Sequence, residues 1–382
     1  MTGSAASVVV IGGGAVGMSI ALHLKWRGAR VQLVDAGTLG GGCSQLGGGW
    51  VAAQGRRNLS QLAFALDSIG YYPELLARIG ADAGFRKAGS FLLMETDEQL
   101  AQRRTFLAHQ MQLPGYDGFE FLDLKQLGEI EPAIRSPRII GGTYRAGDCA
   151  IDPPALCDGL AAAIRSQDIA VAEGARVEGL ARSGGGWTVR STVGDFSADA
   201  VVIAAGPQVA HLAGLAGLDL PLTLISGQIM TTAPQAPYVN APVVVMHNHA
   251  IANCPARDLR QGADGRLWIG TVNHHGTGDA QVRRDDTDII RREMSALFPE
   301  LSDIAFTHGY AGTRPLAEDG LPCYGAAGEG LFIAAPMSGI AEAAAAGRTM
   351  AELVTTGVSA ALPQAFSPLR LVPGAGSAPG GQ

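Results

Sequence analysis

The N-terminal stretch of this sequence constrains its fold more than any other part. An apolar run, Ser7–Ile11, leads into the glycine turn Gly12–Gly17, and a proline-free segment that reaches Arg27 leads to a second apolar run ending at Asp35. Apolar residues recur at every fourth position of the proline-free segment, as they do on one face of a helix. The stretch therefore predicts a strand, a tight turn, a helix and a second strand in one unit.

The spacing of the glycines in that turn is typical of a dinucleotide site. Gly12 allows the tight turn, Gly14 lets the backbone approach a pyrophosphate, and Gly17 lets the helix pack closely on the strand. The helix N-terminus then directs free N–H groups and a partial positive charge at the phosphates. Asp35 can accept hydrogen bonds from ribose hydroxyls, which favours FAD or NAD over NADP. A glycine-rich turn in an unrelated α/β protein is the alternative interpretation.

Composition limits the class of protein. The 382 residues are 47% hydrophobic, which is enough for a large core and two domains. The net charge of −7 argues against nucleic-acid binding. The five cysteines are odd in number and form no CxxC pair, so we expect no disulfide framework, no metal centre and a reducing, cytoplasmic location.

The two ends of the chain and its hydropathy also carry information. The N-terminal apolar run is predicted to be a strand rather than a signal peptide, because no Lys or Arg precedes it and glycines interrupt it. Because no stretch of about 18 uninterrupted apolar residues follows, we expect no membrane span. The Gly/Pro/Ser-rich end, residues 371–382, is expected to be a flexible tail.

Apolar segments far apart in the sequence have the composition of strands from one mostly parallel sheet. These segments are residues 7–35, 200–206 and 330–335, and a helix is expected after the last of them, from about Ala341 to Val354. The intervening segments differ in character. Residues 86–94 have strand character, residues 97–110 have a polar helix pattern, and residues 222–271 are rich in alternating strand patterns.

These patterns predict an α/β protein, α+β overall, in which a Rossmann-like nucleotide-binding domain is interleaved with a mainly antiparallel β domain for the substrate. A ligand in such a protein binds at the domain interface, near the C-terminal ends of the sheet strands. We expect the nucleotide domain from residues 1–80, 145–215 and 310–370, and the substrate domain from residues 81–144 and 216–309.

Two further motifs carry a family resemblance. One is Gly41-Gly42-Cys43-Ser44-Gln45-Leu46-Gly47-Gly48-Gly49, and the other is Gly312-Thr313-Arg314-Pro315 followed by Asp319-Gly320-Leu321-Pro322 and Gly325. Together with the N-terminal glycine turn, they resemble the D-amino-acid oxidase superfamily of FAD-dependent oxidoreductases. This superfamily includes glycine oxidase, sarcosine oxidase, D-amino-acid dehydrogenases and hydroxyproline dehydrogenase subunits. The resemblance covers the chain from Val8 to about Arg370.

The resemblance implies a non-covalent FAD whose ring lies between the two domains. It implies that Gly48 and Gly49 pass close to the ring, where a side chain would leave no room, and that Ser44 faces the pyrophosphate or ribityl region. The helix that begins at Ser338 would stabilise the negative charge of the reduced ring, and Val177 matches the position whose backbone meets the adenine. The cofactor-binding residues expected on this basis are Gly12, Gly14, Ala15, Val16, Gly17, Asp35, Ala36, Cys43, Ser44, Gly48, Gly49, Val177, Ala205, Gly206, Gly312, Arg314, Ser338, Gly339 and Ile340.

The sequence also departs from the family pattern. Gly47 stands where members often carry Asn, and the segment Ala335–Ser338 lacks the second arginine and the aromatic residue of some members. The cysteine that anchors covalent flavin in sarcosine oxidases is not matched, and Cys323 is interpreted as a packing residue.

Arg314 is the principal candidate for a substrate residue. A guanidinium can pair with a planar carboxylate through two hydrogen bonds, and family members hold the amino-acid carboxylate with the arginine at this position. Pro315 favours an extended backbone at Arg314 and so limits where the side chain leaves the chain. The alternative is a structural salt bridge to Glu318 or Asp319.

Other candidates for the pocket are histidines and aromatic residues. His247 and His249 would share one face of a strand and could accept the substrate's ammonium proton or hydrogen-bond the substrate. A polar loop at a strand end is the alternative for both. Trp50 and Tyr324 are candidates for pocket walls or for core residues.

The sequence therefore predicts an FAD-dependent oxidoreductase that oxidises the C–N bond of an amino acid or related secondary or cyclic amine, of the D-amino acid, glycine/sarcosine or hydroxyproline type. Hydride would pass to flavin N5 and leave an imine, with O2 or an electron carrier as the final acceptor. Alternatives are a 2-hydroxy-acid dehydrogenase, the catalytic subunit of a larger amine or opine dehydrogenase, and a non-catalytic nucleotide-binding subunit. A homo-oligomer or a partner subunit remains open.

Overall fold

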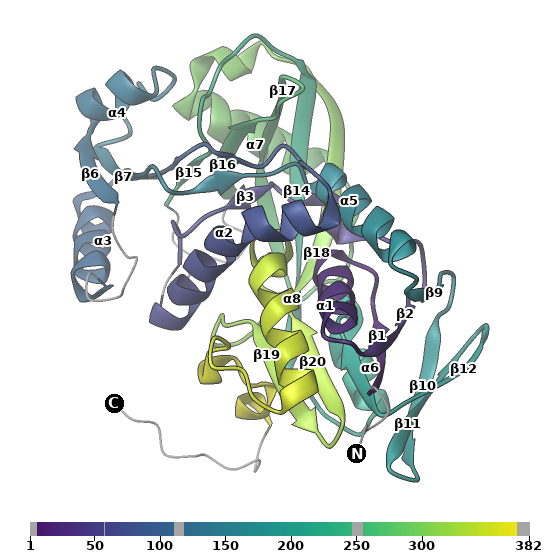
Figure 1. Cartoon of the computed structure of the whole chain (residues 1–382). Coiled ribbons are helices and arrows are strands. Elements are labelled where there is room, and N and C mark those ends of the chain that lie inside the picture. Colours follow the sequence, from purple (N-terminus) through teal and green to yellow (C-terminus); the bar gives the residue numbers. More distant parts are fainter. Residues whose placement is uncertain (1–5, 57, 111–117, 247–254, 373–382) are drawn as a thin grey trace.

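The computed structural model describes residues 6–56, 58–110, 118–246 and 255–372. A six-stranded sheet lies in the lower part of Figure 1, with strand order β19-β20-β13-β1-β2-β9. All neighbours in it are parallel except β19 and β20. The prediction that the three distant apolar segments join one sheet is confirmed. The strands are β1 (Ser7–Ile11), β2 (Arg30–Val34), β9 (Ala170–Ala172), β13 (Ala200–Ile203), β19 (Cys323–Gly328) and β20 (Leu331–Ala335).

Helices cover this sheet and bury its apolar strands. α1 (Ala15–Trp26) is buried from Ala15 to Leu24, and it packs against α8 (Gly339–Thr356). The alanine stripe Ala343–Ala346 and Gly347 allow a close approach, since a Cβ at Gly347 would lie 2.1 Å from Ser19 Oγ. The predicted helix after the third segment is therefore confirmed, and it extends slightly at both ends. The other helices of this half are α2 (Leu59–Ile79), α5 (Pro153–Ser166) and α6 (Val209–Leu215).

An eight-stranded sheet forms the upper half of the molecule in Figure 1, with order β18-β14-β17-β16-β15-β5-β7-β6. It is antiparallel except where β15 pairs with β5. One face packs on α7 (Arg284–Leu297) through buried side chains such as Met230, Ile269 and Met294. The strands are β5 (Ser90–Met94), β6 (Phe119–Asp123), β7 (Gly141–Arg145), β14 (Leu222–Pro234), β15 (Val243–Val245), β16 (Pro255–Gln261), β17 (Arg266–His275) and β18 (Phe306–Ala317).

Smaller elements complete the fold. A short sheet joins β3 (Trp50–Val51), β8 (Cys149–Ala150) and β4 (Arg86–Lys87). A three-stranded sheet of β10 (Val177–Ser183), β11 (Gly186–Ser191) and β12 (Gly194–Ala198) extends from the six-stranded unit. Two helices, α3 (Asp97–Gln110) and α4 (Leu124–Ile130), lie beside the edge of the eight-stranded sheet.

Two segments differ from their predicted form. The strand expected over residues 86–94 is divided into β4 and β5, because Gly89 adopts a φ of +68° that breaks the extended chain. The domain boundary expected at residue 310 falls inside β18, which pairs with β14 along its length and so belongs to the eight-stranded sheet. The polar helix expected over 97–110 is α3. Of the helices in the described part of the chain, none combines the length and the apolar character that a membrane crossing needs.

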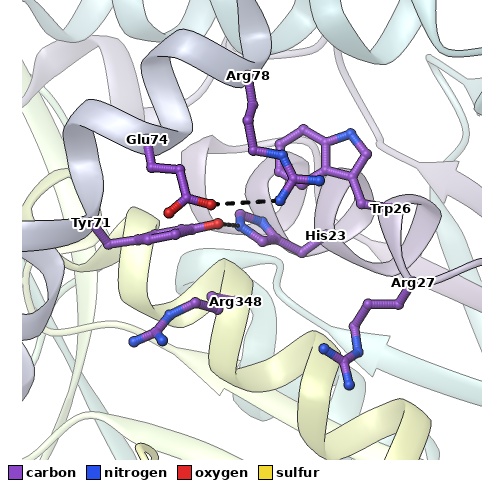
Figure 2. Close-up of a pocket in the computed structure, with 7 residues that line it drawn as sticks. All are labelled: His23, Trp26, Arg27, Tyr71, Glu74, Arg78 and Arg348. Atoms are coloured by element: carbon purple, nitrogen blue, oxygen red, sulfur yellow. Dashed lines mark hydrogen bonds and ion pairs between the residues drawn. The ribbon is translucent and has the colours of Figure 1, made fainter.

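A polar cluster lies on the outer side of α1, where α2 and α8 meet it (Figure 2). His23 is 4% exposed there, and its ring nitrogens contact Ser19 O at 2.7 Å and the Tyr71 hydroxyl at 3.0 Å. Arg78 stacks over Trp26 at 3.8 Å. Burial, together with nearby arginines, lowers the pKa of His23 from 6.5 to about 4.

We expect His23 to make the stability of the protein depend on pH. The unfolded histidine titrates near pH 6.5 and the folded one near 4, so acid protonates the unfolded state first. This contribution to stability is complete above pH 6.5 and is lost as the pH falls toward 4, by about 2 kcal/mol between pH 7.5 and pH 5. Urea unfolding of the wild type and of His23→Gln at both pH values measures it. Because the carboxylates titrate in both proteins, parallel losses would contradict the assignment to His23.

Candidate active site

The glycine turn has the geometry of a dinucleotide site. Gly12 has a φ of +113°, and a Cβ there would lie 2.4 Å from Ala204 O, while a Cβ at Gly17 would lie 1.9 Å from Gly12 O. Gly14 is the N-cap of α1 and provides no side chain there. The carboxylate of Asp35 accepts backbone N–H groups from Gly13 and Gly37, each at 2.6 Å. The helix N-terminus and the acidic residue therefore lie side by side at the C-terminal edge of β1 and β2.

The loop that follows β2 folds back onto this edge. Its short 3-10 helix, Cys43–Leu46, places Ser44 Oγ where it accepts the N–H of Ala15 at 3.0 Å. A Cβ at Gly48 would meet no atom within 4 Å, whereas one at Gly49 would lie 2.2 Å from Ile151 O. Gly48 thus borders open space, which is what a residue next to the ring of a cofactor needs.

The remaining predicted cofactor residues lie around the same edge. A Cβ at Gly312 would lie 3.7 Å from Cys43 Sγ, and the N–H of Thr313 contacts that sulfur at 3.3 Å. Ala205 and Gly206 follow β13 after Ala204, beside the glycine turn. Val177 is buried at the start of β10, and the segment before it is tied to β2 because Ala175 N donates to Asp35 O at 2.8 Å.

The N-terminus of α8 is held by a buried carboxylate. Glu342 accepts the N–H of Ser338 at 2.9 Å and the hydroxyl of Tyr324 at 2.8 Å. Burial raises the pKa of Glu342, and the charge of Arg56 opposes this shift. Arg56 also donates to Ser338 Oγ at 3.3 Å. Tyr324 is 1% exposed and is a core residue rather than a pocket wall.

Arg56 is a site residue that the sequence did not reveal. It supplies a guanidinium beside the start of α8, where the segment Ala335–Ser338 lacks the arginine of some family members. Because Arg56 follows the glycine loop rather than preceding α8, no spacing pattern near Ser338 could have indicated it.

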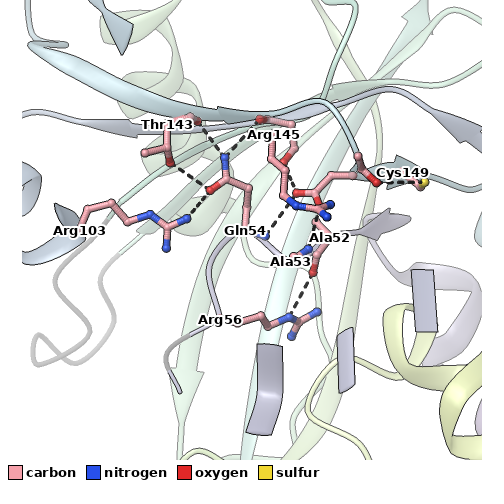
Figure 3. Close-up of polar contacts among 11 residues, drawn as sticks. Ala52, Ala53, Gln54, Arg56, Arg103, Thr143, Arg145 and Cys149 are labelled. Atoms are coloured by element: carbon pink, nitrogen blue, oxygen red, sulfur yellow. Dashed lines mark hydrogen bonds and ion pairs between the residues drawn. The ribbon is translucent and has the colours of Figure 1, made fainter. Parts of the chain in front are cut away.

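A buried polar network fixes the segment that carries Arg56 (Figure 3). Asp148, which has no exposed surface, accepts the backbone N–H groups of Ala53 at 2.9 Å and Gln54 at 3.3 Å. It also accepts the Ser90 hydroxyl at 2.6 Å and pairs with Arg145 at 2.8 Å. The network therefore joins the loop after β3 to strands β5 and β7 of the other sheet.

Gln54 extends this network toward α3. Its amide donates to Thr143 O at 2.8 Å and to Ser90 O at 3.3 Å. Its side-chain oxygen accepts the Thr143 hydroxyl at 3.0 Å and Arg103 Nη2 at 2.5 Å. All four amide contacts are thus made inside the protein, as a buried glutamine requires.

The face of the eight-stranded sheet opposite α7, called here the inner face, carries the substrate candidates. Arg314 and Gly312 are two residues apart in β18, where they are paired with Ile225 and Gly227. Because alternate residues of a strand face the same side, both lie on the same face of the sheet. Since Gly312 faces the cofactor loop at Cys43, the inner face is directed at the six-stranded unit. Arg314 therefore lies on the same face of the sheet as the cofactor loop.

The environment of Arg314 suits a ligand. Its side chain is exposed, yet the protein around it lowers the pKa of the guanidinium, and the nearby Asp258 carboxylate opposes that shift. Asp319 is instead bound to Arg370, at 2.7 Å and 3.0 Å, so the salt bridge considered between Arg314 and Asp319 is not formed.

Other inner-face residues were not indicated by sequence. Tyr310 and Trp268 stack with ring centroids 5.7 Å apart, and Arg260 lies 4.5 Å above the Trp268 ring. The alternating pattern within each strand could have indicated that these residues share a face. The sequence does not show, however, in which register β17 and β18 pair with β14, which lies between them. His247 and His249, the other predicted substrate residues, lie outside the described residues.

Several buried polar atoms of β3 and of the inner face have no hydrogen-bond partner among the described residues. They include Trp50 Nε1, Asn273 Oδ1, and Nε and Nη2 of Arg260. Buried polar groups are nearly always paired in folded proteins, so these atoms indicate where a bound group would complete the site. Together with the glycine turn and the bare surface at Gly48, they fit a dinucleotide cofactor. The fold and site thus define a dinucleotide-binding protein built on a six-stranded and an eight-stranded sheet.

Comparison with known proteins identifies the family. The family model for DAO, FAD-dependent oxidoreductase, matches residues 7–353, and the chain belongs to this family. Glycine oxidase from Geobacillus kaustophilus (strain HTA426) is 29% identical over 337 residues, 86% of each chain. The crystal structure of glycine oxidase from Geobacillus kaustophilus aligns with a TM-score of 0.85 at 27% identity, covering 95% of this chain and 98% of that one. An opine oxidase subunit from Agrobacterium tumefaciens (strain Ach5) is 25% identical over 360 residues, covering 92% of this chain and 93% of that protein.

The cofactor is therefore FAD, and the glycine turn gives a direct test of its binding. We expect Gly12→Ala to abolish FAD retention, because the new Cβ would overlap Ala204 O. Gly28→Ala is the matched control, since Gly28 also has a positive φ, +86°, but no atom lies within 4 Å of its Cβ. The control should lose only about 1–2 kcal/mol of stability. The ratio of flavin to protein absorbance after gel filtration measures both, and a yellow Gly12→Ala protein would refute the assignment.

Proposed function

We propose that this enzyme oxidises the C–N bond of a small amino acid or related secondary amine. The exposed guanidinium of Arg314 on the inner face is the observation that carries this proposal. The names of the relatives, a glycine oxidase and a subunit of an opine oxidase, support amino-acid chemistry. When bound, FAD would accept the hydride, and with it two electrons, from the carbon next to nitrogen.

In this proposal the protein binds and orients its ligands. The N-terminus of α1 and Asp35 hold the nucleotide half of FAD, and Gly48 leaves room for the ring. The N-terminus of α8, with Arg56 beside it, contributes positive potential. Arg314 holds the substrate carboxylate, which orients the carbon–nitrogen bond toward the ring.

We expect Arg314→Ala to reduce kcat/KM by about 100-fold or more, because paired charge-assisted hydrogen bonds to the carboxylate are lost. FAD content should stay unchanged. Arg314→Lys keeps the positive charge but cannot form the paired hydrogen bonds of a guanidinium, so it should recover part of the lost activity. Arg266→Ala, which removes an exposed arginine that pairs with Asp264, is the matched control. Steady-state kinetics and flavin content of the purified variants measure these effects, and unchanged kinetics for Arg314→Ala would defeat the role.

The substrate class is tested by anaerobic bleaching of the flavin absorbance. A panel of D- and L-amino acids, N-methyl amines, proline analogues and 2-hydroxy acids separates the amine proposal from a hydroxy-acid dehydrogenase. We expect bleaching by amines only. Bleaching by hydroxy acids alone would overturn the proposal, and readmitted air would then show whether O2 reoxidises the flavin.

A partner subunit is a second feature to test. The match to a protein named as one subunit of an opine oxidase, over 92% of this chain, supports an assembly in which electrons pass onward. Co-purification of a redox partner would favour the assembly over direct reoxidation by O2. The cytoplasmic location remains a prediction from the cysteine content.

A further inference from the structure

Asp258 is a carboxylate on the inner face that neither the sequence motifs nor the proposed cofactor contacts explain. It lies in β16 and is paired with Gly270 of β17, which is in turn paired with Ile229 of β14. Ile229 is paired with Tyr310 of β18. Residues directly opposite in neighbouring strands share a face, so Asp258 is directed to the same side of the sheet as Tyr310 and Arg314.

The carboxylate is held in place but not neutralised. Asp258 Oδ2 accepts the Thr271 hydroxyl at 3.2 Å, and the side chain is half-buried. Among the described residues no cation forms an ion pair with Asp258. The positive charge of Arg314 is nevertheless close enough to act against the rise in the pKa of Asp258 that burial causes. Burial raises the pKa of Asp258 to about 6, so the group is mainly ionised at neutral pH. A partly buried carboxylate that is ionised and has no paired cation costs free energy of folding, unless a ligand supplies the positive charge.

Between these two charges the inner face carries two glycines. Gly227 and Gly312 are paired side by side on β14 and β18 and add no side chain of their own. A Cβ at Gly227 would lie 3.0 Å from Asn273 Oδ1 and 3.1 Å from Thr271 Cγ2. Asn273 Oδ1 is itself a buried acceptor without a partner among the described residues. The inner face therefore carries a cation on β18, a carboxylate on β16, and an acceptor without a partner among the described residues on β17, which lies between these strands.

We propose that Asp258 binds the substrate's ammonium group while Arg314 binds its carboxylate, so that the enzyme selects zwitterionic amines over 2-hydroxy acids of the same shape. This inference rests on the proposed function, because it assigns the second end of the same substrate site. A hydroxy acid presents the same carboxylate to Arg314 but no positive charge to Asp258. Selection then comes from a charge that only the amine can satisfy.

The test compares matched ligands that differ only in the charged nitrogen. The pairs are sarcosine with methoxyacetate, L-proline with L-tetrahydrofuran-2-carboxylate, and D- or L-alanine with lactate of the same configuration. Dissociation constants for the FAD-loaded enzyme are measured anaerobically, from the shift or the bleaching of the flavin absorbance. We expect the wild type to bind at least one amine about tenfold to 100-fold more tightly than its oxygen counterpart.

Asp258→Asn keeps the shape and removes the charge. It should weaken binding of the amine by about tenfold to 100-fold and leave binding of the oxygen analogue unchanged, so that the preference disappears. Asp264→Asn, which alters an exposed carboxylate in the same β16–β17 hairpin, is the control and should keep the preference. Arg314→Ala should weaken both members of a pair alike.

Each outcome decides between the two proposals. A wild type that binds both members of its best pair equally, or an Asp258→Asn variant that keeps the preference, contradicts the role of Asp258 and leaves the proposed function intact. A wild type that binds no member of any pair contradicts the proposed function and this inference together. Should Asp258→Asn fail to fold, the preference of the wild type by itself still supports or contradicts the role of Asp258.

Discussion

The buried carboxylate of Asp148 is the interaction on which the site depends most. The loop that contains Ala53 and Gln54 follows β3, a strand of only two residues. Asp148 binds two of the loop's N–H groups and connects them to Ser90 and Arg145 of the eight-stranded sheet. Removing one partner of such a buried pair costs about 3–5 kcal/mol. Because Arg56 follows this loop directly, the same network sets where its guanidinium meets the start of α8.

The second constraint is the unequal covering of the eight-stranded sheet. Helix α7 buries one face behind apolar side chains such as Ile269 and Met294. The inner face instead carries Asp258, Arg260 and Arg314, charges that an apolar core could not accept. A sheet with one apolar and one charged face can only be stable if the charged face borders water or ligands. The cofactor loop at Cys43 closes this face from the other side and turns it into a site rather than an outer surface.

Local sequence patterns predicted the parts of the fold that depend on local physics. Strand and helix periodicity, with the glycine spacing, was sufficient for β1, β2, β13 and β20 of the six-stranded sheet and for helices α3 and α8, because each is encoded in consecutive residues. The placement of β18 was predicted less well, since its membership of the eight-stranded sheet depends on pairing with β14, more than seventy residues earlier in the sequence. Arg56 and Asp258 were missed for the same reason. Arg56 meets Ser338 through the tertiary structure, and Asp258 meets Thr271 through strand register. Neither contact leaves a characteristic spacing of residues in the sequence.

The separation of Asp258 from Arg314 shows how strand order can maintain a binding site. These two side chains carry opposite charges on one face, and a direct ion pair would neutralise both. Two strands, β14 and β17, lie between β18 and β16 and keep them apart. The paired glycines, Gly227 and Gly312, add no side chain of their own to this part of the face, whereas the side chains of Asn273 and Thr271 lie close to Gly227. In the proposed site, a zwitterion of a small amino acid supplies the group that pairs with both charges.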